Sequence, residues 1–170
     1  MKRKNLYLMC GIPGSGKSTF CNEMISKSDR KTEYISRDAI RFSYLKDGDD
    51  YFSKEDDVFT TFVSSINDAI DDDSLDDIFV DATHLNERSR NKVLKYLDLD
   101  FVKIIPVNFL IDFDLALERN NLREGRSCVP RSSLINMHSA FRPATHYEKY
   151  PYEKIINIKV TKDGVETEVI

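Results

Sequence analysis

The feature that most constrains this chain is a glycine-rich octapeptide near its start, GIPGSGKS at residues 11–18. It follows a short apolar run at 6–10 and precedes a helical pattern at 17–26, so it joins an expected strand to an expected helix. In that context the glycines let backbone N–H groups turn inward around a nucleotide β-phosphate, while the lysine reaches the β and γ oxygens. We therefore expect ATP to bind here, with Ser18 as a ligand of Mg²⁺. The residues expected to hold the nucleotide are Gly11, Gly14, Ser15, Gly16, Lys17, Ser18 and Thr19.

Two other classes of nucleotide-binding protein fit the sequence less well. GTPases usually carry the base-reading string Asn-Lys-x-Asp, and the nearest string here, NKVL at 91–94, lacks the aspartate and lies inside an expected helix. A motor ATPase needs further elements to couple hydrolysis to motion, for which 170 residues leave little room. The sequence therefore favours a small kinase.

Strand-like and helix-like patterns alternate along the whole chain. We expect strands at 6–10, 33–36, 78–81, 101–109 and 155–160, and helices at 17–26, 53–71, 87–97, 112–121 and 132–141. The end, 165–170, is expected to pair with the last strand as a hairpin around Asp163-Gly164. This alternation predicts an α/β fold of the P-loop NTPase type, with a parallel sheet flanked by helices on both faces. Ligands of such a fold bind beyond the carboxyl ends of the strands.

Length, composition and charge limit the number of domains, the compartment and the partners that fit this chain. With 170 residues, 41% of them hydrophobic, we expect one domain over 1–170. Three scattered cysteines fit a reducing cytoplasm, and no apolar run approaches the roughly 20 residues that span a bilayer. Residues 42–81 carry thirteen acidic and two basic side chains, which most simply form a solvated surface. That charge also favours a strand end over continuous duplex as any nucleic-acid partner.

Asp38 is the candidate catalytic base. It follows the expected strand at 33–36, and a kinase needs a carboxylate near the γ-phosphate to accept the acceptor's proton. Arg41 is three residues later, so both side chains share a face if a helix begins there. Spacing alone leaves an alternative open, in which Asp38 caps a helix and Arg41 forms an ordinary surface ion pair.

Asp81 and a run of arginines complete the candidate set. Asp81 ends an apolar strand, where it could hold a Mg²⁺-bound water, orient Arg41, or simply cap a helix.

A segment at about 119–130 is rich in arginine and is expected to be a mobile lid, whose cations could meet the charge of the transferring phosphoryl group. Arg123, then Arg119, are the favoured nucleotide contacts. The alternative is that these arginines only stabilise the C-terminus of a helix through their positive charge. The role of Arg126 is left open.

The order of these motifs resembles the 5′-kinase domain of phage-type polynucleotide kinases. The resemblance covers roughly residues 5–145 and consists of the octapeptide with the following threonine, ISRDAIR at 35–41, VDATHLN at 80–86 and the arginine-rich lid. It implies that Asp38 is the general base, that Arg41 contacts a phosphate of the acceptor, and that Asp81 and Thr83 belong to the acceptor site. It also implies that Arg123 contacts ATP phosphates. His84 departs from the asparagine that is common in that family, and we assign it no role.

We therefore expect an ATP-dependent polynucleotide 5′-hydroxyl kinase that uses Mg²⁺ and acts on the 5′-OH end of DNA or RNA. Asp38, Lys17 and Arg123 would be its catalytic residues. The alternatives are a P-loop kinase of a small molecule or nucleotide-sugar, of a toxin-like kind, and a nucleotide-binding module without catalysis. The sequence has no Asp-x-Asp-Gly-Thr motif, so we expect no 3′-phosphatase activity.

Overall fold

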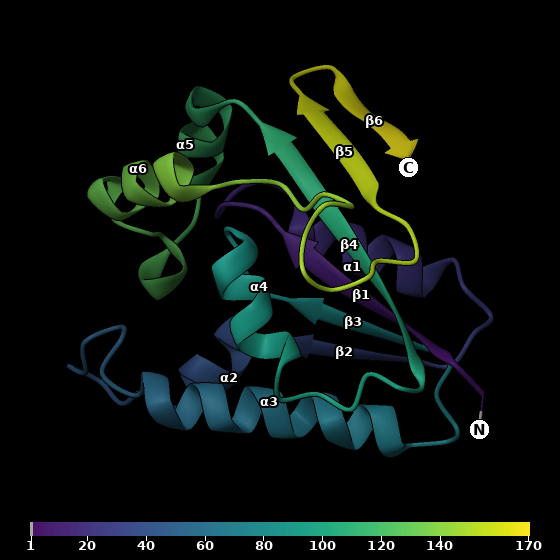
Figure 1. Ribbon diagram of the computed structural model, residues 1–170. Coiled ribbons are helices and arrows are strands. Elements are labelled where there is room, and N and C mark those ends of the chain that lie inside the picture. Colours follow the sequence, from purple (N-terminus) through teal and green to yellow (C-terminus); the bar gives the residue numbers. More distant parts are fainter. Residues whose placement is uncertain (1) are drawn as a thin grey trace.

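A six-stranded sheet in the order β2-β3-β1-β4-β5-β6 lies at the centre of the molecule (Figure 1). The structure, a computed structural model, describes residues 2–170. All neighbouring strands pair in parallel except β5 and β6, which are antiparallel. The strands are β1 (Lys4–Cys10), β2 (Thr32–Ser36), β3 (Asp77–Asp81), β4 (Val102–Ile111), β5 (Ile156–Thr161) and β6 (Gly164–Val169). The expected parallel sheet with a terminal hairpin is confirmed.

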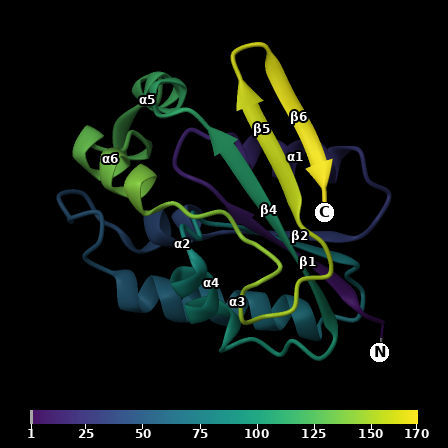
Figure 2. The ribbon, with the colours of Figure 1, turned by 45° about the horizontal axis from the view of Figure 1, so that its top comes forward.

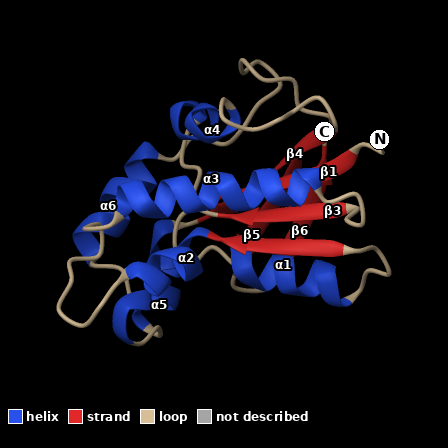
Figure 3. Cartoon of the chain, turned by 90° about the horizontal axis from the view of Figure 1, so that it is seen from below, coloured by secondary structure: helices blue, strands red, loops and turns tan. Residues whose placement is uncertain are grey.

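Helices cover both faces of this sheet, as the alternating pattern predicted. They are α1 (Lys17–Ser26), α2 (Arg37–Tyr44), α3 (Glu55–Asp71), α4 (Glu87–Leu94), α5 (Phe113–Asn121) and α6 (Arg131–Ala140). Figure 3 shows α1 on one side of the strands and α3 and α4 on the other. The core accordingly forms one large cluster on each face, around Cys21 and Phe109 and around Phe62 and Leu94, and a smaller third cluster of Ile12, Ala116 and Leu134. Because β1 and β3 contribute to both large clusters, their residues are apolar in nearly continuous runs.

Helices α5 and α6 differ from the expected bounds by one residue at one or both ends, and α3 and α4 differ by more. Helix α3 begins at Glu55 rather than at 53, because residues 51–54 form turns, and it buries Val58, Phe62 and Ile66 at helical spacing. Helix α4 ends at Leu94 rather than at 97. Leu97 is still buried, but its backbone N–H bonds to Leu94 in a tight turn, so apolar periodicity continues after the helix has ended.

The final hairpin extends the sheet beyond β4. Its turn is Lys162-Asp163, and Gly164, the first residue of β6, has a φ of 137°, a conformation that side-chain-bearing residues rarely adopt. Figure 2 shows β5 and β6 together beside β4, at the opposite end of the strand order from β2. The residues of β6 are exposed, which is the usual state of a short edge strand.

The carboxyl ends of the parallel strands meet at one edge of the sheet. In Figure 1 the arrowheads of β3 and β4 point toward the side that carries α5 and α6. The loop at 11–16, the start of α2 and the segment 82–86 all leave the sheet there. None of the helices described over 2–170 is long and apolar enough to cross a membrane.

Candidate active site

The glycine loop turns sharply into the start of α1. Gly14 and Gly16 have φ values of 83° and 97°, and a Cβ added to Gly14 would lie 2.7 Å from the carbonyl oxygen of Ala116. Gly16 occupies the N-cap position of α1, so the first-turn N–H groups lack the side-chain cap that serine or aspartate would supply. The positive end of the helix is therefore directed at the loop, which is the arrangement that binds phosphate.

The other loop residues differ in what they offer a phosphate. The Lys17 ammonium donates to the carbonyl of Ile12 at 3.0 Å. Burial lowers the pKa of Lys17, while the charge of Asp81 opposes that shift. The N–H of Gly11 donates to the carbonyl of Thr83 at 2.8 Å, so Gly11 shapes the loop rather than presenting a donor. Ser15 is fully buried, and its Oγ has no partner within residues 2–170.

Asp81 lies next to the loop and accepts two hydroxyl hydrogen bonds. Ser18 donates to its Oδ2 at 2.7 Å, and Tyr34 donates to the same oxygen. Arg41 pairs with other carboxylates instead, so the contacts of Asp81 are on the phosphate side of the site. Tyr34 gave no signal in the sequence, because its contact depends on the register that sets β2 beside β3.

The Ser18 and Asp81 oxygens suit Mg²⁺. They are hard oxygen ligands, and Mg²⁺ at phosphate-transfer sites takes one or two protein oxygens and completes its shell with waters and substrate phosphates. A cluster of three or more His, Cys, Asp or Glu side chains is absent from the described part of the chain, and such a Mg²⁺ site does not need one. The residues present therefore fit the metal that the sequence predicted.

Asp38 lies in the first turn of α2, but it does not cap the helix. The cap is Ser36, whose hydroxyl accepts the N–H of Ala39 at 3.2 Å. Asp38 instead binds Arg41, and the Tyr51 hydroxyl donates to the same Oδ1 at 2.8 Å. The Asp38 side chain is 58% exposed, so it remains open to a substrate.

Arg41 is held by a second carboxylate, Glu55 at the start of α3. Its Nε donates to Oε1 at 2.7 Å and its Nη2 to Oε2 at 3.3 Å, and its guanidinium lies 4.6 Å from the centre of the Tyr51 ring. Burial alone raises the pKa of Glu55, but hydrogen bonds and charge from Arg41 and Arg37 bring it below its usual value. Sequence reasoning missed Glu55 and Tyr51, which lie in the acidic segment. An acceptor phosphate at Arg41 would compete with Glu55.

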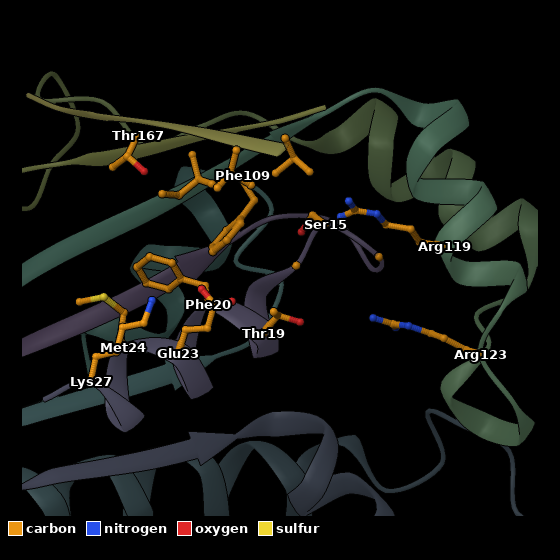
Figure 4. A pocket seen from close by; sticks show the side chains of 15 residues that line it. Ser15, Thr19, Phe20, Glu23, Met24, Lys27, Phe109, Arg119, Arg123 and Thr167 are labelled. Atoms are coloured by element: carbon orange, nitrogen blue, oxygen red, sulfur yellow. The ribbon is translucent and has the colours of Figure 1, made fainter. Parts of the chain in front are cut away.

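Two cavities open beside these groups. The first, of about 330 Å³, is lined by Asp38 and Arg41 together with Lys17, Ser18, Asp81 and Thr83. The second, of about 520 Å³, lies along α1 between the loop and the terminal hairpin. Figure 4 shows Phe20 and Phe109 in its interior and Thr167 on the strand above. Arg123 lines both cavities.

The arginine-rich segment joins α5 to α6 through one 3-10 turn, Gly125–Ser127. Arg119 lies in the last turn of α5, whereas Arg123 lies two residues beyond the end of that helix. Figure 4 shows both side chains extending toward the loop and Thr19. Arg126 donates to the carbonyl of Lys46 at 2.6 Å, which joins this segment to the turns before α3.

His84 is buried under the loop. It has a φ of 39°, and burial lowers its pKa to about 3, so the ring is neutral at neutral pH. Its Nδ1 lies 2.5 Å from the carbonyl of Met9, which makes Nδ1–H the donor. This contact ties the segment 82–86 to the end of β1 and gives His84 a structural place.

A phosphate-binding loop at the end of β1, facing a carboxylate of β3 across the same sheet edge, defines a P-loop kinase-like fold. Residues 6–144 match the AAA domain family, and the chain belongs to that family. No curated protein matches the chain.

Solved structures with a similar fold include kinases of different acceptors. A chain of the Pnkp1/Rnl/Hen1 RNA repair complex aligns with a TM-score of 0.68 and 20% identity, over 82% of this chain and 44% of that one. A fungal RNA kinase aligns with a TM-score of 0.67 and 16% identity, over 96% of this chain and 77% of that one. A gluconokinase from Sinorhizobium meliloti aligns with a TM-score of 0.57 and 15% identity, over 95% of this chain and 86% of that one. This chain thus spans less than half of the matched chain in the RNA repair complex.

Proposed function

We propose that this protein transfers the γ-phosphate of ATP to the 5′-hydroxyl of DNA or RNA, with Mg²⁺. The observation that carries the proposal is that Asp38 lines the same cavity, of about 330 Å³, as Lys17, Ser18 and Arg123. A hydroxyl in this cavity lies between a proton acceptor and the groups that hold the transferring phosphate.

Asp38 takes the proton from the acceptor hydroxyl. Arg41 and Tyr51 both donate to its Oδ1, and residues 2–170 form no hydrogen bond to Oδ2. The two donors therefore orient the carboxylate through one oxygen while the other faces the substrate. General-base assistance of this kind contributes about 10²- to 10⁴-fold to a rate.

The donor side supplies positive charge. The first-turn N–H groups of α1 and the Lys17 ammonium bind the β and γ oxygens, while Ser18 and Asp81 would hold Mg²⁺ through hard oxygens. When bound, Mg²⁺ neutralises charge on the phosphate oxygens. Arg123 reaches from the lid into both cavities and stabilises charge that develops between donor and acceptor. The adenosine of ATP occupies the cavity along α1, against Phe20 and Phe109.

A nucleic-acid acceptor is supported by the motif order and by the RNA kinase and RNA repair proteins among the structural neighbours. A small-molecule kinase is the second candidate. It is favoured by the Glu55 contacts, which occupy the Arg41 guanidinium that an acceptor phosphate would use.

The substitution Asp38→Asn tests the mechanism. It keeps the size of the side chain but removes the proton acceptor, so we expect phosphate transfer to fall at least a hundredfold while ATP affinity is unchanged. Transfer is measured with labelled ATP and a 5′-hydroxyl oligonucleotide, and ATP affinity by calorimetry. The control is Asp47→Asn, an exposed carboxylate of the acidic segment at 42–81. Full activity of Asp38→Asn would overturn the assigned role.

A further inference from the structure

A third cavity, of about 400 Å³, adjoins the proposed acceptor cavity. The two have four lining residues in common, Tyr51, Phe52, Val129 and Met137. An acceptor whose hydroxyl lies at Asp38 can therefore extend directly into this space. We call it the aromatic recess and define it by these four residues together with Arg126, Cys128, Pro130 and Ser133.

The floor of the aromatic recess is a pair of rings held close to Asp38. Tyr51 and Phe52 meet edge to face with centroids 4.7 Å apart, and Phe42 supports Tyr51 at 6.1 Å. The Tyr51 hydroxyl is fixed on Asp38, so the ring pair is anchored to the proposed base. Phe52 is nevertheless 55% exposed, which leaves a large part of its ring available to a ligand.

The other wall comes from the lid and α6. It consists of Cys128, Val129, Pro130 and Met137, with Ser133 and Arg126 as its polar members. A sugar acid or polyol carries a hydroxyl on nearly every carbon, so most of its hydroxyls would lack partners there, and burying unpaired hydroxyls is unfavourable. A flat aromatic ring gains from both walls, because stacking on an aromatic side chain needs only a π face.

Arg126, which also lines the recess, connects its two walls. Arg126 donates to the carbonyl of Lys46, which connects the lid to the segment between α2 and α3 that also carries Tyr51 and Phe52. The segment that carries Arg123 to the donor cavity therefore also lines the recess.

We propose that the aromatic recess holds the nucleobase of the acceptor's terminal nucleotide while the 5′-hydroxyl lies at Asp38. The inference rests on the proposed function and deepens it, because it makes a base-bearing end, rather than a sugar, the acceptor. The walls contact the flat face of a base rather than its hydrogen-bonding edge. Because every base has such a face, we expect all four bases to be accepted.

The test compares two single-stranded oligonucleotides that differ in one respect, a normal or an abasic nucleotide at the 5′ end. Base stacking on an aromatic side chain changes affinity by roughly five- to a hundredfold, so we expect the abasic end to raise KM about tenfold. Phe52→Ala should raise KM for the normal end to the abasic level. Phe52→Tyr should retain the preference and Phe52→Leu should lose most of it. The control is Tyr147→Ala, which removes a ring that is 99% exposed.

The outcomes separate the recess from the kinase activity. Calorimetry of the ADP-bound protein with a normal and an abasic 5′-hydroxyl dinucleotide gives a readout that does not depend on transfer. If phosphate is transferred with equal KM to the normal and the abasic 5′ end, the proposed base-binding role of the recess is wrong and the kinase activity stands. Absence of transfer, with binding that still depends on the base and on Phe52, would overturn the proposed kinase activity alone. Absence of both would overturn both.

Discussion

At the scale of single residues, the least expected contact is the one between Tyr34 and Asp81. Burial and the hydrogen bond to Asp81 both raise the pKa of Tyr34, so its hydroxyl stays protonated and acts as a donor. Tyr34 comes from β2, Ser18 from α1 and Asp81 from the end of β3, and both hydroxyls meet one carboxylate oxygen. Tyr34 thus acts as a positioning residue for the carboxylate that we propose as a Mg²⁺ ligand.

The substitution Tyr34→Phe should weaken the use of Mg²⁺. Loss of an outer-shell partner typically costs 10- to 100-fold in metal affinity, so we expect the Mg²⁺ concentration for half-maximal transfer to rise about tenfold. ATP affinity measured without Mg²⁺ should not change. The matched control is Tyr44→Phe, which removes a hydroxyl that contacts Thr61 2.6 Å away on the surface. An unchanged Mg²⁺ requirement would show that Ser18 alone orients Asp81.

At the scale of elements, a buried ion pair fixes α4 against the segment before β5. Arg90 is fully buried and donates to both oxygens of Glu148, at 3.0 and 2.8 Å. It also donates to the carbonyl of His84 at 2.9 Å, which ties the segment 82–86 to the same anchor. This pair therefore supports the loop beside the site without facing a substrate.

Removing one partner of that pair should be costly. Arg90→Met leaves the Glu148 carboxylate without its main partner, so we expect the free energy of unfolding to fall by about 3–5 kcal/mol. Chemical denaturation measures the change. Lys103→Met, which breaks the exposed pair with Glu153, should cost less than about 1 kcal/mol. Equal effects of the two substitutions would contradict the anchoring role of Arg90.

At the scale of the whole molecule, the sequence predicted the sheet, the flanking helices and the phosphate loop, because buried strands and glycine turns leave local patterns. Two features of the site were out of reach for a physical reason. The cavity along α1 combines Phe20 with Thr167, and these residues are brought together only by the strand order. Glu55 lies in a segment whose charge suggested a solvated surface, yet it binds Arg41 because α3 begins beside α2.

The two-sided site is proposed to pass phosphate from ATP to a nucleic-acid end. The most direct measurement supplies γ-labelled ATP and Mg²⁺ with 5′-hydroxyl oligonucleotides, nucleosides and small alcohols, including gluconate, in parallel reactions. We predict that label appears on the oligonucleotides, at the 5′ end. Label on small molecules alone would contradict the proposed acceptor while leaving the phosphate-binding half of the site in place.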